Sequence, residues 1–211
     1  MNNCNIADEG KVMLGRLPTE LKYYTASDLI RVGKDYDGGY LISRSDFDET
    51  EVVLGFGMND DWSFERQFSK EKSISINIFD GSVSLKYFYK NALKSLIRFD
   101  RPEYFYHWIK VIVNYLVFFR QKQNSHIRKY IGKKTESGNF IDLKSIMDNI
   151  TSEKVFLKVD IEGSEYRILN SIKEYEKRLT GIAIEFHDCD IHINKIISFV
   201  NVWEARHNIQ N

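Results

Sequence analysis

The segment Val155–Tyr166, VFLKVDIEGSEY, constrains the fold more than any other part of the sequence. Its first half is a short apolar run rich in β-branched residues, which is typical of a strand buried on both faces of a parallel sheet. Asp160 and Glu162 follow where this strand ends, and Ser164 and Glu165 then begin a helical pattern. In an open α/β sheet, ligands bind at the carboxyl ends of the strands. The two acids are therefore candidate site residues, and the alternative is a pair of loop carboxylates beside a helix start.

A second apolar segment, Glu51–Phe56, leads into a glycine-rich turn and a further helical pattern. Its Gly55 and the following Gly57 would let the backbone approach a ligand closely, as in nucleotide-binding α/β sheets. The third glycine of a dinucleotide motif is missing, and Asp60 and Asp61 follow instead, where they would repel a pyrophosphate. The pattern favours a ligand with less negative charge, or a turn that is purely structural.

Two further strand patterns end in polar residues. Ser73–Phe79 leads into Asp80, about 25 residues after the first glycine, where a carboxylate can accept both hydroxyl hydrogens of a ribose. Gly181–Phe186 is another apolar strand, and it brings more polar side chains to the same edge of the sheet: Glu185, His187, Asp188 and Asp190. Together these strand ends predict a nucleoside pocket.

The whole chain of 211 residues is predicted to be one domain. Residues 1–50 would form a cap with a hairpin at Asp37-Gly38-Gly39, which also fits a plain β-turn. Residues 51–203 would form the ligand-binding core, and residues 84–135 a helical basic insertion within it. Helices are expected within residues 140–150, from Ser164 through Leu179, and over residues 192–203.

Composition excludes several classes of protein. Thirty basic and thirty acidic side chains give no net charge, so nothing favours nucleic acid as a partner. A hydrophobic content of 43% is typical of a globular chain rather than a disordered one. Cys4 and Cys189 are far apart and lack metal-binding spacing, so neither a disulfide framework nor a zinc site is expected. The first residues lack the pattern of a signal peptide, and a cytoplasmic location is the expectation.

The segment Tyr104–Phe119 is aromatic and apolar but too short to span a bilayer. Helical spacing predicts one inward face: Phe105, Trp108, Ile109, Ile112, Leu116 and Phe119. No acid occurs from Tyr104 to Thr135, whereas seven cations do, among them Lys133 and Lys134. This basic segment would contact an anionic membrane surface, an anionic substrate or a second subunit. The alternative is a buried helix followed by a solvated basic loop.

The order of these strands, glycines and acids resembles the FkbM-type methyltransferases, a class I family that uses S-adenosyl-L-methionine and mostly methylates oxygen. The most specific match is the segment 157–165, LKVDIEGSE, similar to the family's LKIDIEGAE. Supporting matches are Asp37-Gly38-Gly39-Tyr40, the segment 55–61 with Phe64-Glu65, Phe79-Asp80-Gly81 and Ile184-Glu185-Phe186-His187. The matches are spread over residues 31–203.

The resemblance implies a Rossmann-like, mostly parallel sheet with helices on both faces. In the family, the last two of seven strands form an antiparallel hairpin. The sequence ends at Asn211, soon after the helix that would precede that hairpin, so these last strands are expected to be missing.

The resemblance also implies roles for individual residues. The cofactor would be S-adenosyl-L-methionine, held by Gly55, Gly57, Asn59, Asp60, Asp61, Asp80, Gly81 and Asp160. A hydroxyl acceptor needs a base, for which His187 is the first candidate and Asp160 and Glu162 are the others. The alternative for His187 is a histidine that is merely hydrogen-bonded at a loop start. A divalent metal on Asp160 and Asp188 is conceivable, but no metal is predicted.

The acceptor would be a hydroxyl of a sugar, a glycan precursor or a related natural product, and the basic segment mildly favours an anionic one. Two other classes of function stay open. One is a non-catalytic nucleotide-binding domain, against which the missing glycine and the acidic pair count. The other is a peripheral membrane domain that uses the Tyr104–Phe119 helix.

Overall fold

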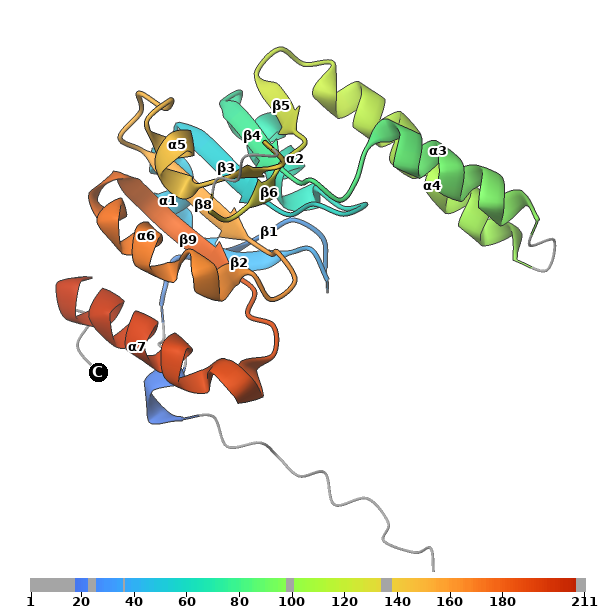
Figure 1. Cartoon of the computed structure of the whole chain (residues 1–211). Coiled ribbons are helices and arrows are strands. Elements are labelled where there is room, and N and C mark those ends of the chain that lie inside the picture. Colours follow the sequence, from blue (N-terminus) through green and yellow to red (C-terminus); the bar gives the residue numbers. More distant parts are fainter. Residues whose placement is uncertain (1–17, 23–25, 36, 98–100, 134–137, 208–211) are drawn as a thin grey trace, which may run out of the picture.

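The computed structural model of the chain describes residues 18–22, 26–35, 37–97, 101–133 and 138–207 (Figure 1). At its centre lies a sheet of five parallel strands, which confirms the predicted α/β class. The strands lie in the order β5 (Asn124–Ile127), β4 (Ser75–Phe79), β3 (Val52–Phe56), β8 (Val155–Val159) and β9 (Leu179–Ile184). The two edge strands of the described sheet are β5 and β9.

Alternate residues of each central strand enter different cores. In β3, Val53 belongs to one apolar cluster and Leu54 to the other; in β8, Phe156 and Leu157 divide in the same way. Both faces of the sheet are buried, which is why these strands are nearly continuous apolar runs.

Helices cover both faces of the sheet (Figure 1). Phe47 and Phe68 pack on the Val53 side, and they come from α1 (Arg44–Glu49) and α2 (Ser63–Lys72). The Leu54 side is covered by α5 (Leu143–Met147), α6 (Leu169–Glu174) and α7 (Cys189–His207). The predicted hairpin is confirmed as the antiparallel pair β1 (Leu29–Val32) and β2 (Tyr40–Ser43).

The sheet has one topological switch point. β3 is the first strand of the sheet in sequence, and it pairs with β4 on one side and with β8 on the other. The chain runs from β3 outward through β4 to β5, and it later crosses over to β8 on the other side of β3. This reversal of direction opens a crevice at the carboxyl ends of β3 and β8.

Two helices, α3 (Leu85–Leu96) and α4 (Pro102–Phe119), form an antiparallel pair that extends away from the sheet (Figure 1). The predicted inward face of α4 is wrong at Ile109 and Leu116, which are exposed. Ile112 is buried as predicted, and Phe105, Trp108 and Phe119 pack against the core. Val111 and Phe118, which were not predicted, are also buried, because α4 packs on α3 along a neighbouring stripe. Among the described residues, no helix combines the length and the apolar character needed to cross a bilayer.

Several predicted boundaries are corrected. The predicted insertion 84–135 ends too late, because β5 pairs with β4 as a strand of the central sheet. The helix predicted through Leu179 is broken into η2 (Glu165–Arg167), α6 and η3 (Glu176–Arg178), and Leu179 begins β9. The small elements are η1 (Thr19–Leu21), β6 (Tyr130–Ile131) and β7 (Phe140–Ile141). The predictions for Cys4, for the first residues and for Lys134 concern positions outside the described part of the chain.

Candidate functional site

A cavity of about 450 Å³ lies at the carboxyl ends of β3, β4 and β8. This is the switch point of the sheet, where open α/β folds bind their ligands, and the volume suits a small-molecule site. Its lining includes the apolar and aromatic side chains of Tyr130, Ile131 and Phe140 and the carboxylates of Asp80, Asp160 and Glu162. The predicted residues that line the cavity are Gly57, Asn59, Asp80, Gly81, Asp160 and Glu162. The structure thus brings most of the predicted site together.

The carboxylate of Asp80 is bonded to the turn that follows β3. Its Oδ2 accepts hydrogen bonds from the backbone N–H groups of Met58 (2.9 Å) and Asn59 (3.1 Å), and its Oδ1 accepts from the N–H and hydroxyl of Ser82. Burial alone would raise the pKa of Asp80, but these four donors outweigh it and lower the pKa below its ordinary value. A carboxylate has about four acceptor positions. A ligand hydroxyl would therefore reach Asp80 by replacing the Ser82 hydroxyl.

The two predicted glycines have different neighbours. A Cβ on Gly57 would lie 1.7 Å from the backbone oxygen of Asp160, and its φ is +83°, so the end of β8 passes directly against this turn. A Cβ on Gly55 would instead lie 2.5 Å from a carboxylate oxygen of Glu65. Gly55 is a buried strand residue that makes room for Glu65, and it does not line the cavity.

Asp60 and Asp61 do not line this cavity, although they were predicted as cofactor residues. Asp61 accepts from the N–H of Ser63 at the start of α2 and pairs with Lys34 at 2.9 Å. Asp60 lies 2.7 Å from Nε2 of His107 on α4. Both carboxylates line a separate hollow of about 130 Å³. The turn after Asn59 carries them to the α4 side, which sequence spacing did not indicate.

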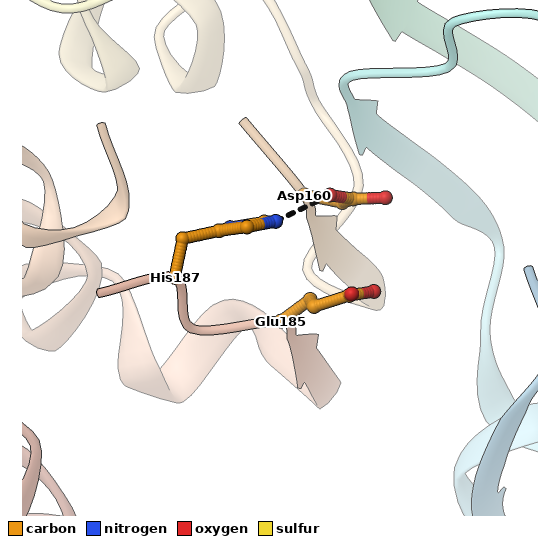
Figure 2. A group of neighbouring side chains, drawn as sticks. All are labelled: Asp160, Glu185 and His187. Atoms are coloured by element: carbon orange, nitrogen blue, oxygen red, sulfur yellow. Dashed lines mark ion pairs between the residues drawn. The ribbon is translucent and has the colours of Figure 1, made fainter. Parts of the chain in front are cut away.

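Beside the cavity, Asp160, Glu185 and His187 lie close together at the ends of β8 and β9, and the imidazole of His187 is directed at Asp160 (Figure 2). One potential ligand atom from each of the three lies within 4.8 Å of the others. Nε2 of His187 is 3.9 Å from Oδ1 of Asp160, which is an ion-pair distance rather than a hydrogen bond. Asp160 belongs to both features, so the three-residue cluster adjoins the cavity.

The ring of His187 is oriented by a buried acid. Its Nδ1 lies 2.9 Å from Oε1 of Glu165, a side chain with no exposed surface. The same oxygen accepts from the N–H groups of Ile161 and Gly163, which fixes the loop after β8. Burial would lower the pKa of His187, but the hydrogen bond to Glu165 and the charges of Glu165, Glu162 and Asp160 outweigh it and raise the pKa.

Glu162, the third predicted catalytic residue, is largely exposed. Its carboxylate lies 3.6 Å from Nε2 of His187, and its backbone has a φ of +51°. It borders the cavity.

A buried lysine lies beneath the cluster. Lys158, in the middle of β8, is 3% exposed, and its Nζ donates to the backbone oxygen of Gly57 at 3.2 Å. The same Nζ lies 3.6 Å from Oδ2 of Asp160 and 4.0 Å from the fully buried Glu65. Burial raises the pKa of Glu65, which Lys158 only partly offsets. Neither oxygen of Glu65 has a hydrogen-bond partner among the residues that the structure describes.

Tyr40 joins the hairpin β1–β2 to this group. Its hydroxyl donates to Oε2 of Glu185 at 3.0 Å, and its ring lies under the Lys158 ammonium at 5.7 Å. Burial, followed by the charge of Asp160, raises the pKa of the Tyr40 phenol, so it stays a hydrogen-bond donor.

Sequence reasoning assigned no role to Lys158, Glu65, Glu165 or Tyr40. A signal was present, because Lys158 interrupts an apolar strand and Glu65 and Glu165 occupy helix faces that are otherwise apolar. A charge in such a position needs a partner. The partners come from other strands, and only the fold identifies them.

Comparisons of the chain with protein-family models, with curated proteins and with solved structures found no significant match.

Proposed function

We propose that the protein transfers a methyl group from S-adenosyl-L-methionine to a hydroxyl of a small acceptor such as a sugar or glycan precursor. The observation that carries this proposal is the cavity at the switch point, whose lining combines apolar and aromatic side chains with carboxylates. The resemblance of its motifs to FkbM-type methyltransferases supports the same assignment.

The turn after β3 favours this cofactor over a dinucleotide. A pyrophosphate is normally bound by free backbone N–H groups at such a turn. Here two of these groups, at Met58 and Asn59, already donate to Asp80. A negatively charged ligand would have to displace a carboxylate, whereas a ligand with positive groups would benefit from the nearby acids.

The cavity matches the parts of the proposed cofactor. The purine would lie along Tyr130, Ile131 and Phe140, and the ribose would lie near Asp80 and Ser82. Its sulfonium and amino groups are positive, so the methionine end would lie toward Gly57 and Asp160. This arrangement would bring the methyl group next to the cluster of Asp160, Glu185 and His187.

The transfer itself is a displacement at carbon. The acceptor oxygen attacks the methyl carbon, the carbon–sulfur bond breaks, and its electrons stay on the neutral thioether sulfur. Most of the rate gain would come from positioning donor and acceptor. The acceptor hydroxyl also loses a proton, and the groups on hand are those predicted from the sequence: His187, Asp160 and Glu162.

The test is isothermal titration of the purified chain with S-adenosyl-L-methionine, with its demethylated product and with NAD. We expect the methyl donor and its product to bind, and we expect no binding of NAD. Tyr130→Ala should weaken donor binding about tenfold, because it removes a ring that would stack on the purine.

The matched control is Tyr106→Ala, which removes an equally large ring from an exposed position on α4 and should leave binding unchanged. The proposal would be overturned if the folded chain bound NAD and did not bind the methyl donor.

A further inference from the structure

We infer that Asp160, Glu185 and His187 form a binding site for one divalent transition-metal ion, of the Mn²⁺ or Zn²⁺ type. Two carboxylates and one imidazole are ligands that such ions accept. Around an ion with bonds of about 2.1 Å, neighbouring ligand atoms are about 3.0–3.5 Å apart. The three side chains, within 4.8 Å of one another, need only a small closure to reach that spacing.

Each proposed ligand is held by a second residue. Glu165 fixes His187 through Nδ1, which leaves Nε2 directed at Asp160. Such a carboxylate–histidine pair is the usual support of a metal-binding imidazole. The Tyr40 hydroxyl donates a hydrogen bond to Glu185, and the Lys158 ammonium forms an ion pair with Asp160.

The charge balance favours a cation. The ligands Asp160 and Glu185 and the adjoining Glu162 and Glu165 supply four carboxylates. Among the described residues in contact with Asp160, the one lysine is Lys158, and it faces Oδ2 rather than the Oδ1 that faces His187. An ion at the cluster would therefore meet carboxylate charge that Lys158 does not fully neutralise.

This site deepens the proposed methyl transfer, although ion binding itself does not depend on it. Three protein ligands leave coordination positions for an acceptor with neighbouring oxygens, such as a sugar. The ion would lower the pKa of a bound hydroxyl, and the proton would pass to water. His187 would then act as a ligand rather than as the base.

The test uses the full chain, stripped of metal with a chelator and titrated with Mn²⁺ while the signal of free Mn²⁺ is followed by electron paramagnetic resonance. We expect one ion to bind, and Glu185→Gln to weaken binding at least about tenfold. The matched control is Asp188→Asn, which removes an equal charge from the next loop position outside the cluster and should change little.

Three results would overturn the metal site: no binding by the folded chain, unchanged binding in Glu185→Gln, or an equal loss in Asp188→Asn. The last would indicate either a diffuse acidic surface or an ion that Asp188 helps to bind, and neither agrees with a site formed by Asp160, Glu185 and His187 alone. Titration with S-adenosyl-L-methionine in the chelator tests the donor cavity separately, so failure of the metal site and failure of the proposed function are distinguishable.

A second inference rests on the helical pair α3–α4, independently of the cavity. Fifteen large hydrophobic side chains are exposed in the described part of the chain. Eleven of them lie within residues 85–97 and 101–119, that is, on α3, on α4 or on the described residues beside them. On α4 they follow helical spacing along one side: Tyr106, Ile109, Val113, Leu116 and Val117. So large an apolar surface on a projecting element is typical of a docking surface.

We propose that the pair α3–α4 docks on an anionic lipid surface. Residues 85–97 and 101–122 carry seven cations and a single acid, Glu103. Lys86, Lys90 and Lys94 recur every fourth residue along α3, beside its exposed apolar side. Apolar side chains with tyrosines and neighbouring cations are the composition of helices that lie in a membrane interface. Two copies of this chain would bring like charges together, which disfavours a dimer through these helices.

The test is co-sedimentation of the full chain with vesicles of phosphatidylcholine alone and with vesicles that also contain phosphatidylserine. We expect binding to the second kind only, with a loss at high salt. Val117→Glu should reduce binding severalfold. Ile191→Glu on α7, where the side chain is 72% exposed against 62% for Val117, is the matched control and should bind normally.

Equal binding to both kinds of vesicle, or no binding to either, would overturn this inference. So would a dimer in solution that Val117→Glu converts to a monomer, because the surface would then be a subunit interface.

Discussion

We expect Gly57→Ala to lower the free energy of unfolding by more than about 3 kcal/mol. The added Cβ would lie 1.7 Å from the backbone oxygen of Asp160, in a neighbouring strand end that cannot move alone. That strand end also accommodates the buried Lys158, so the backbone shift would disturb the cluster as well as the cavity. Urea unfolding followed by circular dichroism measures the effect.

The matched control is Gly138→Ala. Gly138 also has a positive φ, of +69°, but no atom of the described residues lies within 4 Å of the position of its Cβ. This change should cost about 1 kcal/mol, from backbone strain alone. Equal losses in the two variants would show that strain, and not the close approach of β8, makes glycine necessary at position 57.

The second large effect is expected for Lys158→Met, which should lower the free energy of unfolding by about 3–5 kcal/mol. Within the described part of the chain, the variant removes the cation that pairs with the fully buried carboxylate of Glu65, and that carboxylate has no hydrogen-bond partner there. Asp160 is partly exposed and can be solvated by water, so the loss arises mainly at Glu65. Urea unfolding again provides the measurement.

The loss in Lys158→Met should grow as the pH rises. The pKa of Glu65 is already raised by burial, and removing Lys158 raises it further. A carboxyl whose pKa is higher in the folded state than in the unfolded state stabilises the fold below its unfolded pKa. That contribution is lost as the pH rises through the folded pKa, because the buried group must then ionise.

Two further variants test this explanation. Lys154→Met removes an exposed lysine four residues earlier, directly before β8, and should leave the free energy of unfolding nearly unchanged. The double variant Glu65→Gln, Lys158→Met should recover much of the lost stability, because no buried charge is left without a partner. A double variant as unstable as Lys158→Met alone would locate the loss elsewhere.

The strands were predictable because their signal is local. The runs around Val53 and Leu157 are apolar and rich in β-branched residues, since both faces of a parallel sheet are buried. The strand around Ile76 alternates polar and apolar residues, which is also a local strand signal. Helix ends were harder to predict. The region 164–179 has a helical pattern, but the structure divides it into η2, α6 and η3, and Leu179 already pairs with β8 as the first residue of β9.

The inward face of α4 was misjudged for a related reason. Apolar residues occur all around that helix, so periodicity could not select the stripe that meets α3. Its exposed apolar side became visible only when the packing was known.

For the candidate site, the sequence alone determined which residues stand at the ends of strands. Asp80, Asp160 and His187 could be placed at one edge of the sheet because parallel strands end on the same side. Tertiary structure decided which of them meet. Asp60 and Asp61 are adjacent to the glycine turn in sequence, yet they lie outside the cavity, because the turn bends them toward α4.

Tertiary structure also decided the contacts of four residues to which sequence reasoning assigned no role: Glu165, Lys158, Glu65 and Tyr40. A buried charge is stabilised by whichever opposite charge or donor the fold brings within a few ångströms, and that distance depends on strand order and register. Local patterns in the sequence determine the strands and their polar ends. The contacts between those ends are long-range, and only the tertiary structure decides them.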